Sequence, residues 1–220
     1  MKVILYGATG MVGQGVLREC LADPEVEQVL AVGRSACGVE HPKLRELVRA
    51  DLFEYAGIED ELAGYDACFF CLGVSAAGMS EEAYTKITYD LTLAVGQTLA
   101  RLNPEMSFIY VSGLGTDSTQ QGRSMWARVK GRTENDLLGL PFKAAYMFRP
   151  GFIQPMHGIK SRTTSYRVLY AIATPLFPML KALFPRQVTT TENVGVAMLH
   201  VAKHGHESSL LGNEAINACG

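Results

Sequence analysis

Three glycines, spaced three residues apart, follow directly on an apolar segment at the start of the sequence. The segment covers residues 2–6, and the glycines are Gly7, Gly10 and Gly13. In this arrangement the first glycine lets the chain turn out of a strand, the second leaves room for a diphosphate against backbone N–H groups, and the third lets a helix pack closely on the sheet. Apolar residues at helical spacing come next: Met11, Val12, Val16, Leu17 and Leu21. The pattern predicts a dinucleotide site. A plain strand-to-helix turn is the weaker alternative, because tight turns use glycine too.

Length and composition limit the class of protein. With 220 residues, we expect a single domain (1–220) with a buried core. Charged residues make up 19% of the chain, the formal net charge is -2 and like charges do not cluster, so we expect no nucleic-acid partner. The odd number of cysteines, five, and the lack of a recognisable signal peptide favour a cytoplasmic protein without disulfides.

Two apolar segments need an interpretation of their own. Cys68 and Cys71 form a C-x-x-C pattern inside the apolar run 67–72, and we expect them to pack as small hydrophobic residues in a buried strand, with no bound metal. The most apolar stretch, 168–184, is interrupted by prolines and a lysine and is slightly short of a membrane span. We therefore expect no membrane association there, and a core helix or a subunit contact instead.

Strand-like runs alternate with helical patterns through most of the chain, which predicts a parallel sheet covered on both faces. The fold class is therefore α/β, a doubly wound Rossmann-type sheet. Residues 152–220 are less regular, and we expect them to form in part a small cap on the substrate side. The expected strands cover residues 2–6, 28–32, 44–48, 67–72, 108–111, 144–148 and 214–218, and the expected helices after the first cover 53–63, 80–102, 124–138 and a segment from about 189 to 203.

The end of the second strand indicates which dinucleotide would bind. An NAD-selective site has an acidic residue there for the ribose 2′-hydroxyl. This chain instead has Arg34 and Ser35, a planar set of N–H donors beside a hydroxyl, which suits a phosphate. NADP is therefore favoured over NAD. The alternative is that Arg34 is an ordinary solvated arginine.

Motifs along the first 152 residues together resemble the atypical short-chain dehydrogenases/reductases, and most closely the Tat-interacting protein oxidoreductase-like branch. Each motif alone is weak, whereas the ensemble is far more specific. The matching pieces are Gly7-Ala8-Thr9-Gly10-Met11-Val12-Gly13, Asp51-Leu52, Cys71-Leu72-Gly73, Val111-Ser112, Val129-Lys130-Gly131 and Phe148-Arg149-Pro150-Gly151.

The resemblance implies a role for each of these pieces. It places Asp51 and Leu52 at the adenine, Lys130 at the nicotinamide ribose and Ser112 at a substrate oxygen. It also implies that Cys71, Leu72 and Gly73 line the middle of the cofactor, and that Pro150 and Gly151 border the nicotinamide.

One catalytic position departs from the family pattern. The tyrosine that normally passes the proton stands four residues before the lysine, and here that position is Trp126. An indole N–H donates a hydrogen bond but does not exchange its proton at accessible pH, so Trp126 is no general acid. Replacement donors would be His157 or Tyr166, although either is more often an ordinary loop or packing residue. Thr88 occupies a position where extended members often carry an asparagine.

The catalytic pair has structural alternatives as well. Ser112 would serve only to cap the turn after its strand, and Lys130 would be a solvated helix lysine paired with Glu134 one turn later. The glycine pattern at the front of the chain makes these alternatives weaker. The polar, glycine-rich segment 113–124 is expected to be a mobile loop beside the substrate.

Two functions from different classes fit these residues. The first is an NADP-dependent oxidoreductase, or an epimerase-like relative, that transfers hydride to or from a small carbonyl or alcohol. The second is a catalytically weak NADPH-binding sensor or scaffold, in which Trp126 occupies substrate space and cofactor occupancy controls a protein partner. The substrate, the partner and the oligomeric state, with a homo-oligomer as one option, are not encoded in any motif of this sequence.

Overall fold

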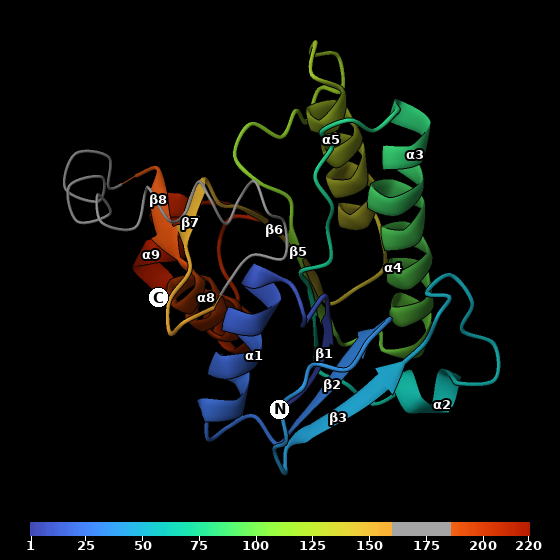
Figure 1. The fold of residues 1–220 in the computed structure, drawn as a ribbon, viewed down its shortest axis with the longest axis vertical. Coiled ribbons are helices and arrows are strands. Elements are labelled where there is room, and N and C mark those ends of the chain that lie inside the picture. The colour runs from blue at the N-terminus through green and yellow to red at the C-terminus, as the bar shows by residue number, and fades with distance from the viewer. Residues whose placement is uncertain (160–185) are drawn as a thin grey trace.

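A seven-stranded parallel sheet forms the centre of the protein in the computed structural model, which describes residues 1–159 and 186–220 (Figure 1). The strand order is β3-β2-β1-β4-β5-β6-β9, and every neighbouring pair is parallel. This is the order of the doubly wound dinucleotide-binding fold with one strand added, so the predicted fold class is confirmed. The strands are β1 (Lys2–Tyr6), β2 (Gln28–Gly33), β3 (Leu44–Val48), β4 (Ala67–Phe70), β5 (Ser107–Val111), β6 (Ala144–Arg149) and β9 (Leu210–Gly212).

Helices cover both faces of the sheet (Figure 1). On one face, α1 (Met11–Ala22) and α8 (Thr191–His204) lie side by side, with α9 (Asn213–Cys219) next to α8. The other face carries α2, α3, the π-helical turn η1, α4 and α5. Their bounds are Glu59–Leu62, Glu81–Thr85, Lys86–Asp90, Leu91–Leu102 and Met125–Leu138. Each face buries its own apolar cluster, so the strands are apolar on both sides, as expected for a covered parallel sheet.

Most predicted elements lie within two residues of the observed ones, and two predictions are wrong. The helix expected over 53–63 is reduced to α2, because Gly57 has a φ of 80° and the helix begins only after Ile58. The strand expected over 214–218 is the helix α9, and the strand β9 comes directly before it. A five-residue segment is too short for its periodicity to separate a strand from a helix.

The carboxyl-terminal part is more closely integrated into the sheet than a separate cap would be. Thr190 caps α8, accepting a hydrogen bond from Asn193 N at 3.0 Å, and β9 extends the sheet beyond β6. Two short strands, β7 (Phe152–Gln154) and β8 (Val188–Thr190), pair in parallel as a second small sheet that the sequence pattern did not predict. The apolar stretch 168–184 lies outside the described residues.

From β1 the chain builds the sheet in one direction, through β2 and β3, and then returns to build it in the other direction, starting with β4. The strand order therefore reverses between β1 and β4. Ligands of doubly wound folds bind at the carboxyl ends of the strands next to such a point. The glycine turn follows β1, and the motifs around Cys71, Ser112 and Pro150 follow β4, β5 and β6. The topology therefore brings these sequence motifs to one edge of the sheet. Among the described residues, no helix is long and apolar enough to cross a membrane.

Candidate functional site

The glycine turn after β1 is packed too tightly for side chains. Gly7 has a φ of 80°, and its carbonyl oxygen accepts a hydrogen bond from Gly10 N at 2.9 Å. A Cβ at Gly13 would lie 2.0 Å from that same oxygen, so only glycine lets α1 approach the turn this closely. Gly10 is the N-cap of α1, where no side chain covers the amino end of the helix. The backbone therefore leaves a helix amino terminus accessible to a phosphate.

The segment after β4 packs against this turn on the side of Gly7. Cys71 N donates to Tyr6 O at 3.0 Å, and a Cβ at Gly7 would lie 2.6 Å from Leu72 N. Cys71 and Leu72 thus border the glycine turn, and their expected role, with Gly73, in lining the middle of the cofactor stays a prediction. Cys68 is fully buried in β4, and burial raises the pKa of both Cys68 and Cys71. Neutral, buried thiols support the interpretation of the C-x-x-C pattern as packing.

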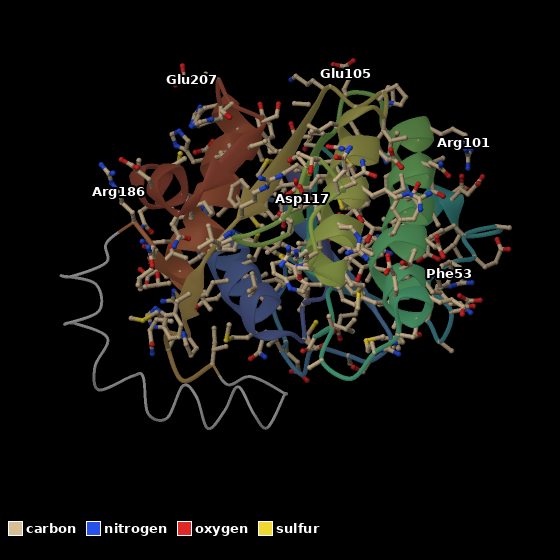
Figure 2. The ribbon with its side chains drawn as sticks, turned by 90° about the horizontal axis from the view of Figure 1, so that it is seen from above. Phe53, Arg101, Glu105, Asp117, Arg186 and Glu207 are labelled. Atoms are coloured by element: carbon tan, nitrogen blue, oxygen red, sulfur yellow. The ribbon has the colours of Figure 1, made fainter. Side chains whose placement is uncertain are left out.

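The expected adenine end lies on the β3 side of the sheet. Arg34 and Ser35 follow β2 directly and are exposed, and Arg34 makes no hydrogen bond or ion pair with the described residues. Leu52 is buried, while Asp51 is exposed and its Oδ1 accepts Phe53 N at 2.8 Å. Figure 2 shows Phe53 on the side of the molecule opposite Arg186, which precedes β8.

Ser112 and Lys130 meet at the end of β5. Ser112 is buried, and its hydroxyl donates to Phe148 O on β6 at 3.1 Å instead of capping the following turn. Lys130 is partly buried on α5, and its ammonium donates to the Ser112 carbonyl. Burial lowers the pKa of Lys130 to about 8, although the charge of Glu134 raises it in part. The structure thus excludes the solvated-lysine alternative and leaves two of the three ammonium N–H donors for a ligand.

Glu134 pairs with a different partner from the one the sequence suggested. Its carboxylate is 1% exposed and accepts hydrogen bonds from Arg149 Nε at 3.0 and 3.2 Å and from Arg149 Nη2. Arg149 also donates to Ser118 Oγ. This buried pair joins α5 to the end of β6, immediately before Pro150 and Gly151. Sequence reasoning noticed Glu134 but missed Arg149 as its partner.

The indole of Trp126 packs against the loop that follows β5. A Cβ at Gly115, whose φ is 88°, would lie 3.3 Å from Trp126 Cη2, so the ring fills the space beside this glycine. Trp126 is one helical turn before Lys130 on α5. The side chain therefore lies one helical turn from Lys130, and it brings no exchangeable proton to that position.

The segment 113–124 is held to α5 instead of extending as an unattached mobile loop. Gly131 has no side chain, and a Cβ there would lie 1.8 Å from Asp117 O, so the loop rests directly on the helix. Asp117 N donates to Ala127 O at 3.1 Å, and Asp117 Oδ2 accepts Gly122 N at 2.6 Å. Asp117 lies near the centre of the view in Figure 2. Its carboxylate accepts hydrogen bonds from the Thr119 hydroxyl and from backbone N–H groups of the loop, and these bonds lower the pKa of Asp117.

No hydrogen bond in the described structure links His157 or Thr88, residues named above as possible parts of a proton relay, to Ser112 or Lys130. His157 Nε2 lies 2.8 Å from Glu192 Oε2, and both side chains are partly exposed at the start of α8. Tyr166 lies outside the described residues. Thr88 is buried in η1, against α5, and its hydroxyl is without a hydrogen-bond partner in the described structure. Neither His157 nor Thr88 forms a hydrogen bond with Lys130 in the described structure, so Lys130 is the titratable group at this position.

A cavity of about 470 Å³ lies beyond Ser112, at the carboxyl ends of β5 and β6. Gly113, Pro150 and Gly151 line it, so it adjoins the expected nicotinamide position. Gly151 N donates to Asn213 Oδ1 at 3.0 Å, and Asn213 is buried. No sequence signal could have linked Asn213 to this site, because it is 62 residues from Gly151. Among the residues the structure describes, no cluster of His, Cys, Asp or Glu could hold a metal ion.

Comparison with known proteins gives a family match and several relatives. Residues 3–123 match the model of the NAD dependent epimerase/dehydratase family. Protein FMP52-1, mitochondrial, from Scheffersomyces stipitis is 26% identical over 194 residues, which cover 86% of this chain and 84% of that protein. Protein fmp52, mitochondrial, from Emericella nidulans is 30% identical over 159 residues, which cover 69% of this chain and 66% of that protein. The solved structure of MoeE5 in complex with UDP-glucose and NAD has a TM-score of 0.68 at 14% identity, covering 100% of this chain and 81% of that one.

These comparisons confirm one prediction and contradict another. The similarity to short-chain dehydrogenases/reductases with a Rossmann-type sheet is confirmed at the level of this broad family, whereas the Tat-interacting branch stays a prediction. The prediction of a cytoplasmic protein is wrong by this comparison, because several curated relatives are named as mitochondrial proteins. The number of cysteines was therefore an insufficient ground for predicting a location.

Proposed function

Because the chain belongs to the NAD dependent epimerase/dehydratase family, we propose that it is an NADP-dependent oxidoreductase, or an epimerase-like relative, acting on a small carbonyl or alcohol. One observation carries the proposal. The buried end of β5 joins Ser112 to the ammonium of Lys130, between the glycine turn on one side and the 470 Å³ cavity on the other. A dinucleotide at the turn would supply or accept hydride beside that cavity.

The preference for NADP rests on the end of β2. Arg34 is exposed, makes no bond to the described residues and has Ser35 beside it, so its five N–H donors are free for a 2′-phosphate. No carboxylate occupies that position to accept the 2′-hydroxyl of NAD. Gly10 and the first turn of α1 would bind the diphosphate, with Leu52 beside the adenine.

Lys130 is our candidate for both the ribose contact and the proton. Its ammonium uses one N–H on the Ser112 carbonyl, which leaves one for a ribose hydroxyl and one for a substrate oxygen. A pKa of about 8 lies close to neutral pH, where a general acid is most effective. In reduction, Lys130 would give its proton to the carbonyl oxygen as the carbonyl carbon gains hydride, and solvent would then reprotonate the amine.

Ser112 would assist only after a rotation of its hydroxyl. In the structure that hydroxyl donates to Phe148 O, so its proton is in use. A rotation of the Ser112 side chain about χ1 would direct its O–H at a substrate oxygen. The Phe148 carbonyl would keep its other hydrogen bond, which it accepts from Ser112 N at 2.9 Å. The cost of losing one neutral hydrogen bond is about 1 kcal/mol.

The proposal is tested by NADPH oxidation with a panel of small aldehydes and ketones. Turnover is expected, and Ser112→Ala should lower kcat/KM by at least tenfold while NADPH affinity stays within twofold. The matched control is Ser75→Ala, an exposed serine in the segment after β4. Tight NADPH binding without turnover of any carbonyl would count against an oxidoreductase.

The runner-up, an NADPH-dependent sensor or scaffold, has Trp126 as its supporting observation. The indole packs at Gly115, next to the catalytic pair, in the place of the usual proton donor. Trp126→Tyr distinguishes the two functions. A strong rise in turnover would show that the remaining machinery is competent for catalysis, whereas unchanged inactivity together with NADPH-dependent capture of a protein partner would favour the sensor.

A further inference from the structure

The cavity beside the catalytic pair has mainly apolar walls. The loop after β5 contributes Leu114, the segment after β6 contributes Pro150, Gly151 and Phe152, and the strand β8 contributes Val188. Leu114 is 59% exposed, so its side chain is accessible to a ligand. Among the described lining residues, none carries a charge. Its volume of about 470 Å³ lies in the lower part of the usual range for small-ligand sites.

Three backbone N–H donors in these walls are already used. Leu114 N donates to Pro150 O at 2.8 Å, and Phe152 N donates to Gln187 O at 2.9 Å. Gly151 N donates to Asn213 Oδ1 at 3.0 Å. Proline has no N–H, so four of the lining residues offer no free backbone donor. Gln187 is the polar side chain among the described lining residues, so a ligand with many hydroxyl groups would lose more hydrogen bonds to water than these walls replace.

Resting on the proposed reductase function, we propose that the substrate carries an uncharged, apolar group next to its reacting carbonyl, and that this group lies against Leu114, Phe152 and Val188. The reacting oxygen then makes its polar interactions with Ser112 and Lys130, and Gln187 is the remaining polar side chain of the described cavity walls. Nucleotide sugars are disfavoured as substrates, because a diphosphate would require cationic donors that the described walls do not provide.

A homologous series of straight-chain aldehydes, from propanal to hexanal, tests the proposal with the full-length protein and saturating NADPH. Each added methylene should raise kcat/KM by about fourfold while the chain remains within the cavity. Glyceraldehyde, which has hydroxyl groups on a three-carbon chain, should react at least tenfold more slowly than propanal in kcat/KM. UDP-glucose should give no turnover.

Leu114→Asn should reduce the increase in kcat/KM that each added methylene gives. It should also raise KM more than it lowers kcat. Leu138→Asn is the matched control, since Leu138 is 39% exposed at the end of α5 and does not line the cavity. Circular dichroism and NADPH affinity should be unchanged in both variants. The same chain-length dependence in wild type and Leu114→Asn would overturn the assigned location of the apolar group.

The outcomes separate this inference from the proposed function. A flat or falling chain-length dependence together with good turnover of glyceraldehyde or UDP-glucose would overturn the apolar substrate class and leave the reductase function in place. No turnover of any carbonyl by the NADPH-loaded protein would overturn both.

Discussion

Replacing Lys130 by arginine tests whether this residue supplies the proton. The ammonium of Lys130 has a pKa of about 8 because it is buried beside the Ser112 carbonyl, so it loses its proton as the pH rises through that value. If the protonated form is the active one in carbonyl reduction, kcat/KM should be level at low pH and fall above pH 8. One unit above the pKa only about a tenth of the enzyme is protonated, so activity should fall about tenfold.

Arginine keeps the charge and the hydrogen-bond donors but does not release a proton in a protein. The affinity of Lys130→Arg for NADPH should therefore not fall above pH 8. Its kcat should be lower than that of the wild type by a factor of about 10² to 10⁴, the usual contribution of a positioned acid. Stopped-flow or steady-state NADPH oxidation from pH 6 to pH 10 measures both effects. Wild-type activity in Lys130→Arg, or a wild-type profile level to pH 10, would refute the assignment of Lys130 as proton donor.

Three other substitutions follow from the same structure. In Gly10→Ala the new methyl group meets only Gly7 O, at 3.3 Å, so the free energy of unfolding in urea should change by less than about 1 kcal/mol. The same methyl group would lie where the phosphate binds, so the affinity for NADPH, measured by calorimetry, should fall at least tenfold. Arg34→Ala should lower the affinity for NADPH by about tenfold or more and leave the affinity for NADH unchanged. An NADPH affinity equal to that of the wild type would reject the 2′-phosphate contact. Glu134→Leu leaves Arg149 without its buried partner and should lower the free energy of unfolding in urea by about 3–5 kcal/mol. The double variant Glu134→Leu with Arg149→Met should recover most of this loss, and a single variant as stable as wild type would contradict a buried pair.

The parts of the molecule that the sequence predicted are those with strong local signals. The glycine turn and the apolar run before it are specified by adjacent residues, so the first strand, the first helix and the expected phosphate site were all accessible from the pattern. The helix over 124–138 was equally clear, and it sets Trp126, Lys130 and Glu134 at one-turn intervals. Strand order then follows from the alternation of strands and helices.

Long-range pairings account for what the sequence did not reveal. Glu134 stands four residues after Lys130, where a local ion pair is the natural expectation, yet it lies buried against Arg149, which comes from the neighbouring strand. The contact of Asn213 with Gly151 depends on β9 joining the sheet beside β6. Such contacts depend on which strands become neighbours, and neither residue type nor spacing encodes them.

The most direct test of the account is a calorimetric titration of the wild-type protein with NADPH and, separately, with NADH. We expect saturable binding of one nucleotide per chain. The binding of NADPH should be tighter than that of NADH, because Arg34 gains a phosphate partner. No measurable heat or saturation with either nucleotide at millimolar concentration would contradict the assignment of the glycine turn as a dinucleotide site.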